Sequence, residues 1–217
     1  MPISETYNID CNTFMATCKD KQFDLAICDP EYGIGFSSYE RGSSGIKVKE
    51  RYTKNGKKTW DSKTPDQSYF NELFRVSKNQ IICGGNYFNL PPTQGFVFWY
   101  KRNPVPNFAD GEYIWTSFQR PALCFDYQYY GNIEGDTNRK DITIVPTQKP
   151  VQLYKWLLKN YAKPGDTIFD SHMGSQSSRI ACYEGGFDFI GCELDKEYFD
   201  AGNKRFENYK LRLKLNF

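Results

Sequence analysis

Short apolar runs that end in polar turns alternate with segments of helical periodicity along this chain of 217 residues. The run Phe23–Cys28 is β-prone and stops at Asp29 and Pro30, as expected of a buried strand that delivers polar groups to its carboxyl end. Strands that alternate with helices predict an α/β fold, and ligands bind such sheets at the carboxyl ends of the strands. The predicted strands are Tyr7–Cys11, Phe23–Cys28, Gln80–Cys83, Phe96–Tyr100, Tyr113–Phe118, Ala122–Phe125, Thr167–Asp170 and Phe187–Cys192. The predicted helices are Asn12–Thr17, Pro65–Val76, Val151–Tyr161, Ser177–Gly185 and Lys196–Tyr209.

Two of the predicted strands are close neighbours in the sequence. Only Gln119, Arg120 and Pro121 separate Tyr113–Phe118 from Ala122–Phe125. A short polar connection that contains proline is typical of a turn between adjacent strands. We therefore expect these two strands to pair with each other as an antiparallel hairpin.

One long segment, residues 33–64, shows no hydrophobic period, and a loop of this length inside a compact domain is usually functional or mobile. Between Arg41 and Lys58 it carries seven basic residues against one acid, Glu50. We interpret it as a flexible basic flap that closes on a phosphate backbone; a solvated, disordered insertion is the alternative. A second polar and irregular segment lies within residues 103–146 and is a candidate specificity insert. The basic residues of the flap are Arg41, Lys47, Lys49, Arg51, Lys54, Lys57 and Lys58.

The composition narrows the class of protein. A hydrophobic fraction of 39% over residues 1–217 predicts one globular domain with a sizeable core. The net charge is only +2, so any nucleic-acid footprint must be local. Seven cysteines without a Cys-x-x-Cys pair argue against a disulfide framework and a zinc site, so we expect a reducing compartment and no metal. No apolar run approaches membrane-spanning length and no export signal opens the chain, so we expect a cytoplasmic protein without a membrane partner.

The strand end at Asp29 carries groups that suit attack by a weak nitrogen nucleophile. The exocyclic amine of adenine or cytosine has its lone pair delocalised into the ring, and two fixed acceptors can localise it. The Asp29 carboxylate and the Pro30 carbonyl oxygen would each accept one amine hydrogen, which directs the lone pair at an electrophile. Tyr32 offers a face for stacking a base. The alternative is an ordinary strand-to-loop turn, because Asp-Pro followed by Gly33 is a common turn composition.

The last third of the chain reads as a β-α-β-α unit with an acid at the end of each strand. Glu193 follows Asp170 by roughly 20 residues, the spacing at which a nucleotide-binding unit places an acid on ribose hydroxyls. Such a unit could hold NAD or another adenosine cofactor. The turn Ser171–Gln176, however, contains only Gly174 in place of the three glycines that admit a pyrophosphate. This turn favours a cofactor without phosphates, and the sulfonium methyl of S-adenosyl-L-methionine is the electrophile that the Asp29 site needs.

Several motifs, in their order along the chain, resemble those of the amino-group DNA methyltransferases. They are Asp29–Tyr32 after an apolar strand, Gly84–Phe88, Thr147–Val151, Phe169–Ser177 and Ile190–Asp195. Because the catalytic motif comes first, the chain is similar to the permuted beta group of that family. The resemblance implies a class I S-adenosylmethionine-dependent methyltransferase fold, with a Rossmann-like mixed sheet, helices on both faces and an antiparallel hairpin. It also implies a catalytic half at about 1–125, a cofactor half at about 147–217, and a bacterial or phage enzyme that could form a homodimer.

The resemblance implies a role for each matching residue. Asp29 and Pro30 would hold the target amine, and Tyr32 would stack on a base flipped out of duplex DNA. Lys149 would contact the methionine carboxylate of the cofactor, and Glu193 would take its ribose hydroxyls. The full cofactor set is Asp10, Cys11, Lys149, Asp170, Met173, Gly174, Ser175, Gln176, Ser177, Glu193 and Leu194.

The four-residue motif Asp29–Tyr32, called the quartet below, also predicts the target base. In the family, the Asp-Pro-Pro-Tyr form is usually adenine-specific, so Asp29 favours transfer to N6 of adenine in duplex DNA. The alternatives are N4 of cytosine, an RNA amine, a protein amide, or a degenerate protein that binds cofactor or DNA without turnover.

The chain departs from the family pattern at two places. Glu31 replaces the second proline of the quartet and puts a negative charge near DNA phosphates. The turn Ser171–Gln176 replaces a more usual Pro-Phe-x-Gly-Ser-Gly, so that Gln176, where glycine is usual, is expected to crowd the cofactor. His172 lies in the same turn, and we do not expect it to act as a general base, since no nucleophile needs activation.

Overall fold

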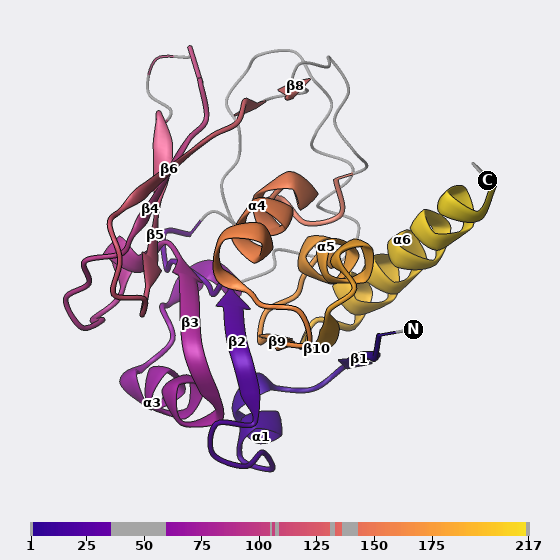
Figure 1. Cartoon of the computed structure of the whole chain (residues 1–217), viewed down its shortest axis with the longest axis horizontal. Coiled ribbons are helices and arrows are strands. Elements are labelled where there is room, and N and C mark those ends of the chain that lie inside the picture. The colour runs from indigo at the N-terminus through magenta and orange to yellow at the C-terminus, as the bar shows by residue number, and fades with distance from the viewer. Residues whose placement is uncertain are drawn as a thin grey trace.

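The computed structural model describes residues 2–35, 60–104, 106, 109–130, 133–135 and 143–215. Within this part of the chain, the main feature is an eight-stranded sheet with the order β1-β10-β9-β2-β3-β5-β4-β6 (Figure 1). Its strands are β1 (Ser4–Tyr7), β2 (Phe23–Cys28), β3 (Ser77–Cys83), β4 (Val97–Tyr100), β5 (Gly111–Thr116), β6 (Leu123–Asp126), β9 (Thr167–Asp170) and β10 (Asp188–Cys192). A separate pair consists of β7 (Tyr129–Tyr130) and β8 (Ile133–Glu134).

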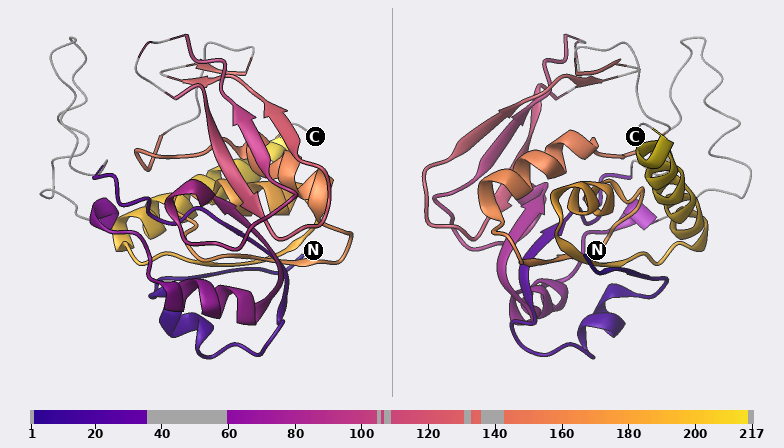
Figure 2. Two further views of the ribbon diagram at one scale, coloured as in Figure 1. Left: turned by 90° about the vertical axis from the view of Figure 1, so that its left-hand side faces the viewer. Right: turned by 45° about the vertical axis from the view of Figure 1, so that its right-hand side comes forward.

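Helices cover both faces of this sheet, as the two further views show (Figure 2). The helices are α1 (Cys11–Met15), α3 (Gln67–Val76), α4 (Val151–Tyr161), α5 (Ser177–Gly185) and α6 (Lys196–Leu215), with 3₁₀ turns η2 (Trp60–Ser62) and η3 (Gly85–Tyr87). Helices α4 and α5 pack on one face, and α1 and α3 pack on the other. The predicted α/β, Rossmann-like fold with a mixed sheet is therefore confirmed.

The two helical layers explain why the central strands are apolar on both sides. In β2, Leu25 and Ile27 join the core beneath α4, whereas Ala26 and Cys28 join the core beneath α3. All four side chains are at most 1% exposed. A parallel strand covered on both faces has no polar face, which is why Leu25–Cys28 is continuously apolar.

The predicted hairpin between Tyr113–Phe118 and Ala122–Phe125 is wrong. Strand β5 lies between β3 and β4 and is antiparallel to both, while β6 lies on the far side of β4 and runs parallel to it. The hairpin in this sheet joins β4 to β5 through the longer connection 101–110. Because β3 and β4 already occupy both edges of β5, the short connection 117–122 must carry the chain past β4 instead of turning back.

The first strand also ends earlier than predicted. Strand β1 stops at Tyr7, where its pairing with β10 ends at Cys192. Asp10 is the N-cap of α1, and its Oδ1 accepts a hydrogen bond from the backbone N of Thr13 at 2.9 Å. Cys11 is therefore the first residue of a helix and not the last of a strand.

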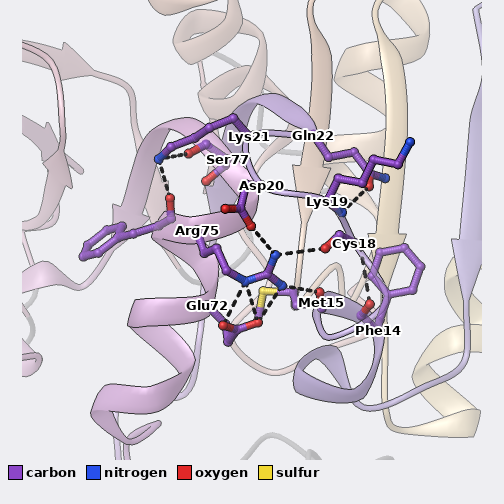
Figure 3. A network of polar contacts seen from close by, with 11 residues as sticks. Phe14, Met15, Cys18, Lys19, Asp20, Lys21, Gln22, Glu72, Arg75 and Ser77 are labelled. Carbon is purple, nitrogen blue, oxygen red and sulfur yellow. Dashed lines mark hydrogen bonds and ion pairs between the residues drawn. The ribbon is translucent and has the colours of Figure 1, made fainter.

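A polar network ties the chain together at the amino ends of β2 and β3 (Figure 3). Arg75, at the end of α3, donates to the carbonyl oxygens of Cys18 at 2.9 Å and Met15 at 2.8 Å. It also pairs with Asp20 at 2.8 Å and Glu72 at 2.7 Å. One guanidinium thus fixes the connection between α1 and β2 against α3.

Among the described residues, no helix has the length and apolar character needed to cross a membrane.

Candidate active site

The predicted site residues lie at the carboxyl edge of the sheet, where β2 and β9 are neighbours. From β9 the chain crosses one face through α5 to β10, and from β2 it crosses the other face through α3 to β3. Crossovers on opposite faces leave a crevice between the two strands, which is where open α/β sheets bind ligands. The backbone pairing of β2 with β9 covers only Leu25 with Ile168 and Ala26 with Phe169, so the two strand ends separate beyond it.

A cavity of about 550 Å³ occupies this crevice. That volume lies within the range of roughly 300–1,000 Å³ typical of sites for small molecules and cofactors. The predicted residues that line it are Asp29, Pro30, Tyr32, Asp10, Cys11, Lys149, Met173, Gly174, Ser175, Glu193 and Leu194. The structure thus brings the quartet and most of the predicted cofactor set into one cavity. Three members of that set, Asp170, Gln176 and Ser177, do not line it.

Asp29 is held by two donors on a single oxygen. Its Oδ1 accepts from the Lys149 ammonium at 2.7 Å and from the Tyr32 hydroxyl at 2.7 Å. Lys149 also donates to the Tyr32 hydroxyl oxygen at 2.9 Å, so the three groups close a triangle. No hydrogen bond to the other carboxylate oxygen, Oδ2, is found within the described part of the chain. Asp29 is therefore oriented through Oδ1 while Oδ2 can accept from a ligand.

Glu112, on β5, completes this cluster and was missed by sequence reasoning. Its Oε2 lies 3.3 Å from the Lys149 ammonium, and Lys101 binds its other oxygen. Burial alone would raise the pKa of Glu112, but Lys149 and Lys101 outweigh it and hold the pKa at about 2. Burial likewise favours loss of the proton from Lys149, and Asp29 and Glu112 outweigh it, so its pKa stays well above the ordinary value. The ammonium is charged and shared between two carboxylates.

The Tyr32 ring is packed as well as hydrogen-bonded. It stacks on Tyr87 with ring centroids 4.8 Å apart and contacts Phe88 edge-on. Gly84, with a φ of +67°, lies so close that a Cβ there would fall 2.3 Å from the Tyr32 ring. The Gly84–Phe88 motif noted in the sequence therefore supports Tyr32 from behind, and a larger residue at Gly84 would displace the ring.

Asp170 and Glu193 hold the turn Ser171–Gln176, called the cofactor turn below. Asp170 is 1% exposed; its Oδ1 accepts from the backbone N of His172 at 3.0 Å, and its Oδ2 accepts from the Ser178 hydroxyl at 2.5 Å. Burial raises the pKa of Asp170 to about 7. Glu193 accepts from the backbone N of Gly174 at 3.0 Å, and burial raises its pKa too. Asp170 thus organises the turn from behind, whereas Glu193 reaches the cavity itself.

Gln176 does not crowd the cavity. Its amide donates to Asn203 at 3.0 Å and its carbonyl oxygen accepts from Arg179 at 2.9 Å, which turns the side chain toward α6. Its φ of +61° lies in the left-handed region, which explains why glycine is usual at this position. The expectation that Gln176 crowds the cofactor site is therefore wrong. Ser177 also points away, donating to the backbone oxygen of Lys149 at 2.8 Å.

Two further departures from the family pattern, Glu31 and His172, meet in the cavity. The Nε2 atom of His172 lies 3.4 Å from the Glu31 carboxylate. Both residues line the cavity, between the quartet and the cofactor turn. Tyr69, on α3, also lines it and bonds the Ser171 hydroxyl at 2.7 Å. These contacts join positions distant in the sequence, so no local pattern could have revealed them.

The central part of the basic flap predicted to contact DNA, residues 36–59, lies outside the described residues. This applies to all seven of its predicted DNA-binding side chains: Arg41, Lys47, Lys49, Arg51, Lys54, Lys57 and Lys58. Of the same loop, the described residue Asp61 is 2% exposed and accepts from the backbone N of Gly33 at 2.8 Å. Asp61 thus fixes the start of the flap to its end, beside the cavity.

The sequence matches known proteins over most of its length. The profile of a family described as DNA methylase matches residues 46–204. The chain is 22% identical to the Type II methyltransferase M2.MboI of Moraxella bovis, over 97% of this chain and 90% of that protein. It is 23% identical to the Type II methyltransferase M2.DpnII of Streptococcus pneumoniae, over 91% of this chain and 87% of that protein.

Solved structures share the fold at lower identity. The complex of M1.HpyAVI with SAM superposes with a TM-score of 0.58 at 20% identity and covers 93% of this chain and 98% of that one. The PvuII DNA methyltransferase, described as cytosine-N4-specific, also has a TM-score of 0.58, at 12% identity, and covers 97% of this chain and 93% of that one. At these identities the likeness concerns the arrangement of the sheet and its helices.

Proposed function

We propose that this chain, which belongs to the family of DNA methylases, transfers a methyl group to the N6 amine of adenine in duplex DNA. The coarser part of this statement follows from the family: the chain is an amino-group DNA methyltransferase, and its methyl donor is S-adenosyl-L-methionine. The choice of adenine, the flipped base and the residue roles below are our proposal.

One observation carries the proposal: Asp29 and Pro30 share a cavity with the turn that follows β9 and with Glu193. A transfer between a bound amine and a bound methyl donor requires both sites to open into one space, with the reacting atoms about 3 Å apart. The shared cavity supports the proposal, since residues that follow β2, β9 and β10 open into one space.

The proposed role of Asp29 is to accept one hydrogen of the target amine through Oδ2. Lys149 and Tyr32 hold Oδ1, so the carboxylate keeps its orientation when the amine arrives. The Pro30 carbonyl oxygen accepts the second amine hydrogen. With both hydrogens engaged, the nitrogen lone pair points at the methyl group, and the rate gain comes from position and electrostatics.

The residues around the cofactor turn fit S-adenosyl-L-methionine. When bound, that molecule supplies a methyl group activated by a sulfonium centre. Glu193 reaches the cavity with a carboxylate that suits ribose hydroxyls, and Gly174 leaves open space beside Val145, where a Cβ would otherwise project. Asp10 and Cys11 line the same cavity from α1, where we propose that they approach the adenine ring.

Duplex DNA hides the adenine amine inside the base stack, so the proposed reaction requires base flipping. We assign the phosphate contacts to the basic residues between Arg41 and Lys58, and the stacking of the extruded base to Tyr32.

The second candidate function is transfer to N4 of cytosine. It is favoured by the shared fold with the PvuII enzyme, described as cytosine-N4-specific, whereas Asp29 at the head of the quartet favours adenine.

The test uses the purified chain, labelled S-adenosyl-L-methionine and unmethylated genomic DNA, followed by nucleoside analysis and single-molecule sequencing. We expect N6-methyladenine at a recurrent short sequence. Label in N4-methylcytosine would keep the mechanism and overturn the base. If no label reaches DNA while the cofactor still binds, the active-enzyme proposal fails for DNA, and a parallel reaction with RNA decides between another substrate and a protein that only binds.

A further inference from the structure

Glu31 and His172 belong to two different turns of the active site. Glu31 follows β2 and stands inside the quartet, while His172 follows β9 and stands inside the cofactor turn. Their side chains come within 3.4 Å, and both are partly buried, with His172 19% and Glu31 29% exposed. Each replaces an uncharged residue of the family pattern, so the two changes together create one ion pair across the crevice.

The backbone does not hold these two turns together. The β2–β9 pairing ends at Ala26 and Phe169, although β2 stays paired with β3 as far as Cys28. Beyond that point, side chains must fix how far apart the strand ends lie. Within the described residues, the Glu31–His172 contact is the ion pair that links residues 29–32 with residues 170–177.

His172 is firmly placed on its own side of the crevice. Its Nδ1 bonds the Ser171 hydroxyl at 2.8 Å, and that hydroxyl bonds the buried Tyr69 at 2.7 Å. Its backbone N donates to Asp170 at 3.0 Å. A rigid imidazole can therefore act as an anchor for the more exposed Glu31.

The charge state of His172 is consistent with such an anchor. Burial by itself would lower the pKa of His172, but the neighbouring Cys11, Glu31 and Asp170 outweigh burial and raise it to about 10. Within the described residues, the titratable groups around the ring are these three, Glu193 after β10, and Tyr69 on α3, whose ring contacts the imidazole edge-on at 5.3 Å. The imidazolium is thus the dominant form at neutral pH.

We propose that Glu31 and His172 are a positioning pair that sets the distance between the amine-holding turn of β2 and the cofactor turn of β9. The inference rests on the methyl transfer proposed above. Neither residue touches the reacting atoms in this assignment; both act through the placement of Asp29 relative to the methyl donor. A displacement of about 1 Å between reacting groups can cost a hundredfold in rate, so a contact of this kind has a measurable effect.

The first test reads the pair directly, without turnover. His172 is the only histidine of the chain, so its imidazole resonances report a single titration in the full-length protein. We expect the raised pKa of His172 to fall by about one unit or more in Glu31→Gln. The matched control is Lys78→Met, which removes the Lys78–Asp24 ion pair at the other end of β2 and leaves the titration unchanged. If the pKa of His172 is unchanged in Glu31→Gln, the proposed ion pair between Glu31 and His172 is overturned.

The second test is a double-mutant cycle on the rate of transfer. Glu31→Gln and His172→Phe are each expected to lower kcat about tenfold, with KM for S-adenosyl-L-methionine and the melting temperature changed little. The double variant is expected to be no slower than either single variant, because both changes remove the same contact. The positioning role is overturned if the two single losses in kcat multiply in the double variant. It is also overturned if the variants change only KM.

The cycle also separates this inference from the function on which it rests. It is scored on whichever base the wild-type chain methylates, so a cytosine product leaves it intact. If the wild-type chain transfers no methyl group, the proposed function and the pair's role fail together. If the wild-type chain is active and the two changes act independently, only the positioning role fails.

Discussion

The two ends of β2 carry charge clusters of opposite character. At the amino end, Arg75 binds two backbone carbonyls and two acids, of which Asp20 is 77% exposed (Figure 3). At the carboxyl end, Lys149 is 4% exposed and lies between Asp29 and Glu112. The first cluster closes a loop with hydrated charges. The second keeps charges away from water, where each has a stronger effect on its neighbours.

The pKa values of Glu72 and Asp170 shift in opposite directions, whereas the pKa of Glu112, which has two cations beside it, is lowered to about 2. At the amino end, the Arg75 hydrogen bond lowers the pKa of Glu72, as is usual for a paired surface acid. At the carboxyl end, burial raises the pKa of Asp170 to about 7. Shifts of that second kind disfavour folding at neutral pH and are typical of functional sites. We therefore expect the amino end of β2 to contribute mainly to stability and the carboxyl end to contribute to the proposed methyl transfer.

The largest expected effect is on catalysis at the carboxyl end. Asp29→Ala should lower the rate of methyl transfer at least about a hundredfold, because the amine loses one of its two acceptors. Asp20→Ala, at the amino end, is the matched control and should retain the wild-type rate. Asp20→Ala should unfold at nearly the wild-type temperature, and Asp29→Ala should stay folded at the assay temperature because Lys149 keeps Glu112 as its partner. An Asp29→Ala protein with more than a tenth of wild-type activity would contradict the role of Asp29.

The next effect concerns stability and contrasts the two cations. Lys149→Met should lower the free energy of unfolding by about 3–5 kcal/mol, because Asp29 would lose its cation and Glu112 would keep only Lys101. Arg75→Met should cost clearly less than Lys149→Met, since water can replace most of the partners of Arg75. Urea unfolding measures both. Adding Glu112→Gln to Lys149→Met should recover part of the loss, and equal costs for the two cations would remove the distinction between the clusters.

The third effect is on the pH dependence of stability. The pKa of Asp170 is raised from 3.8 to about 7, so the unfolded chain releases this proton at lower pH than the folded chain. The free energy of unfolding should therefore fall by a few kcal/mol as the pH rises from about 4 to about 7. Denaturant titrations of wild type and Asp170→Asn over this window should show a flatter profile in the variant. Parallel profiles would contradict the raised pKa.

At the amino end of β2, the contribution of Glu72 to the free energy of unfolding should change with pH in the opposite direction. The pKa of Glu72 is lowered, so its contribution to stability is present above its ordinary value of 4.5 and is lost on acidification. Glu72→Gln should therefore differ from wild type at neutral pH and approach it in acid. The same denaturant titrations supply this comparison.

The smallest effect is expected at Gln176. Gln176→Gly relieves a left-handed backbone conformation but removes the contacts with Asn203 and Arg179, so the free energy of unfolding should change by no more than about 1 kcal/mol. Affinity for S-adenosyl-L-methionine should stay within about twofold, because the replaced side chain faces α6. Calorimetry measures the affinity, and a large gain would show that Gln176 does obstruct the cofactor.

The sequence predicted the parts of this site that depend on local signals. Asp29 and Glu193 were found because each directly follows a buried apolar run, and the carboxyl ends of parallel strands meet at one edge. Helix α4 begins where Pro150 predicted it, and it ends at Tyr161 as the periodicity indicated.

The parts that the sequence did not predict depend on partners far along the chain. Glu112 has no local signal, and it became a site residue only because β5 inserts between β3 and β4. The same insertion made the hairpin prediction wrong, since Gln119–Pro121 resembles a turn whatever strand follows. The contact between Glu31 and His172 was invisible for the same reason: two departures were noted separately, and only the fold brings them together.

The neighbours β2 and β9, between which the cavity opens, are separated by most of the chain. During synthesis, β2 and β3 leave the ribosome and can pair early, but the edge of β2 that faces β9 has no partner until the last third has emerged. Pairing across such a separation carries a closure entropy that local hairpins avoid. The crevice between β2 and β9 therefore closes late, together with the pairings of β10, and until then β2 presents an open strand edge on which nascent chains can associate wrongly.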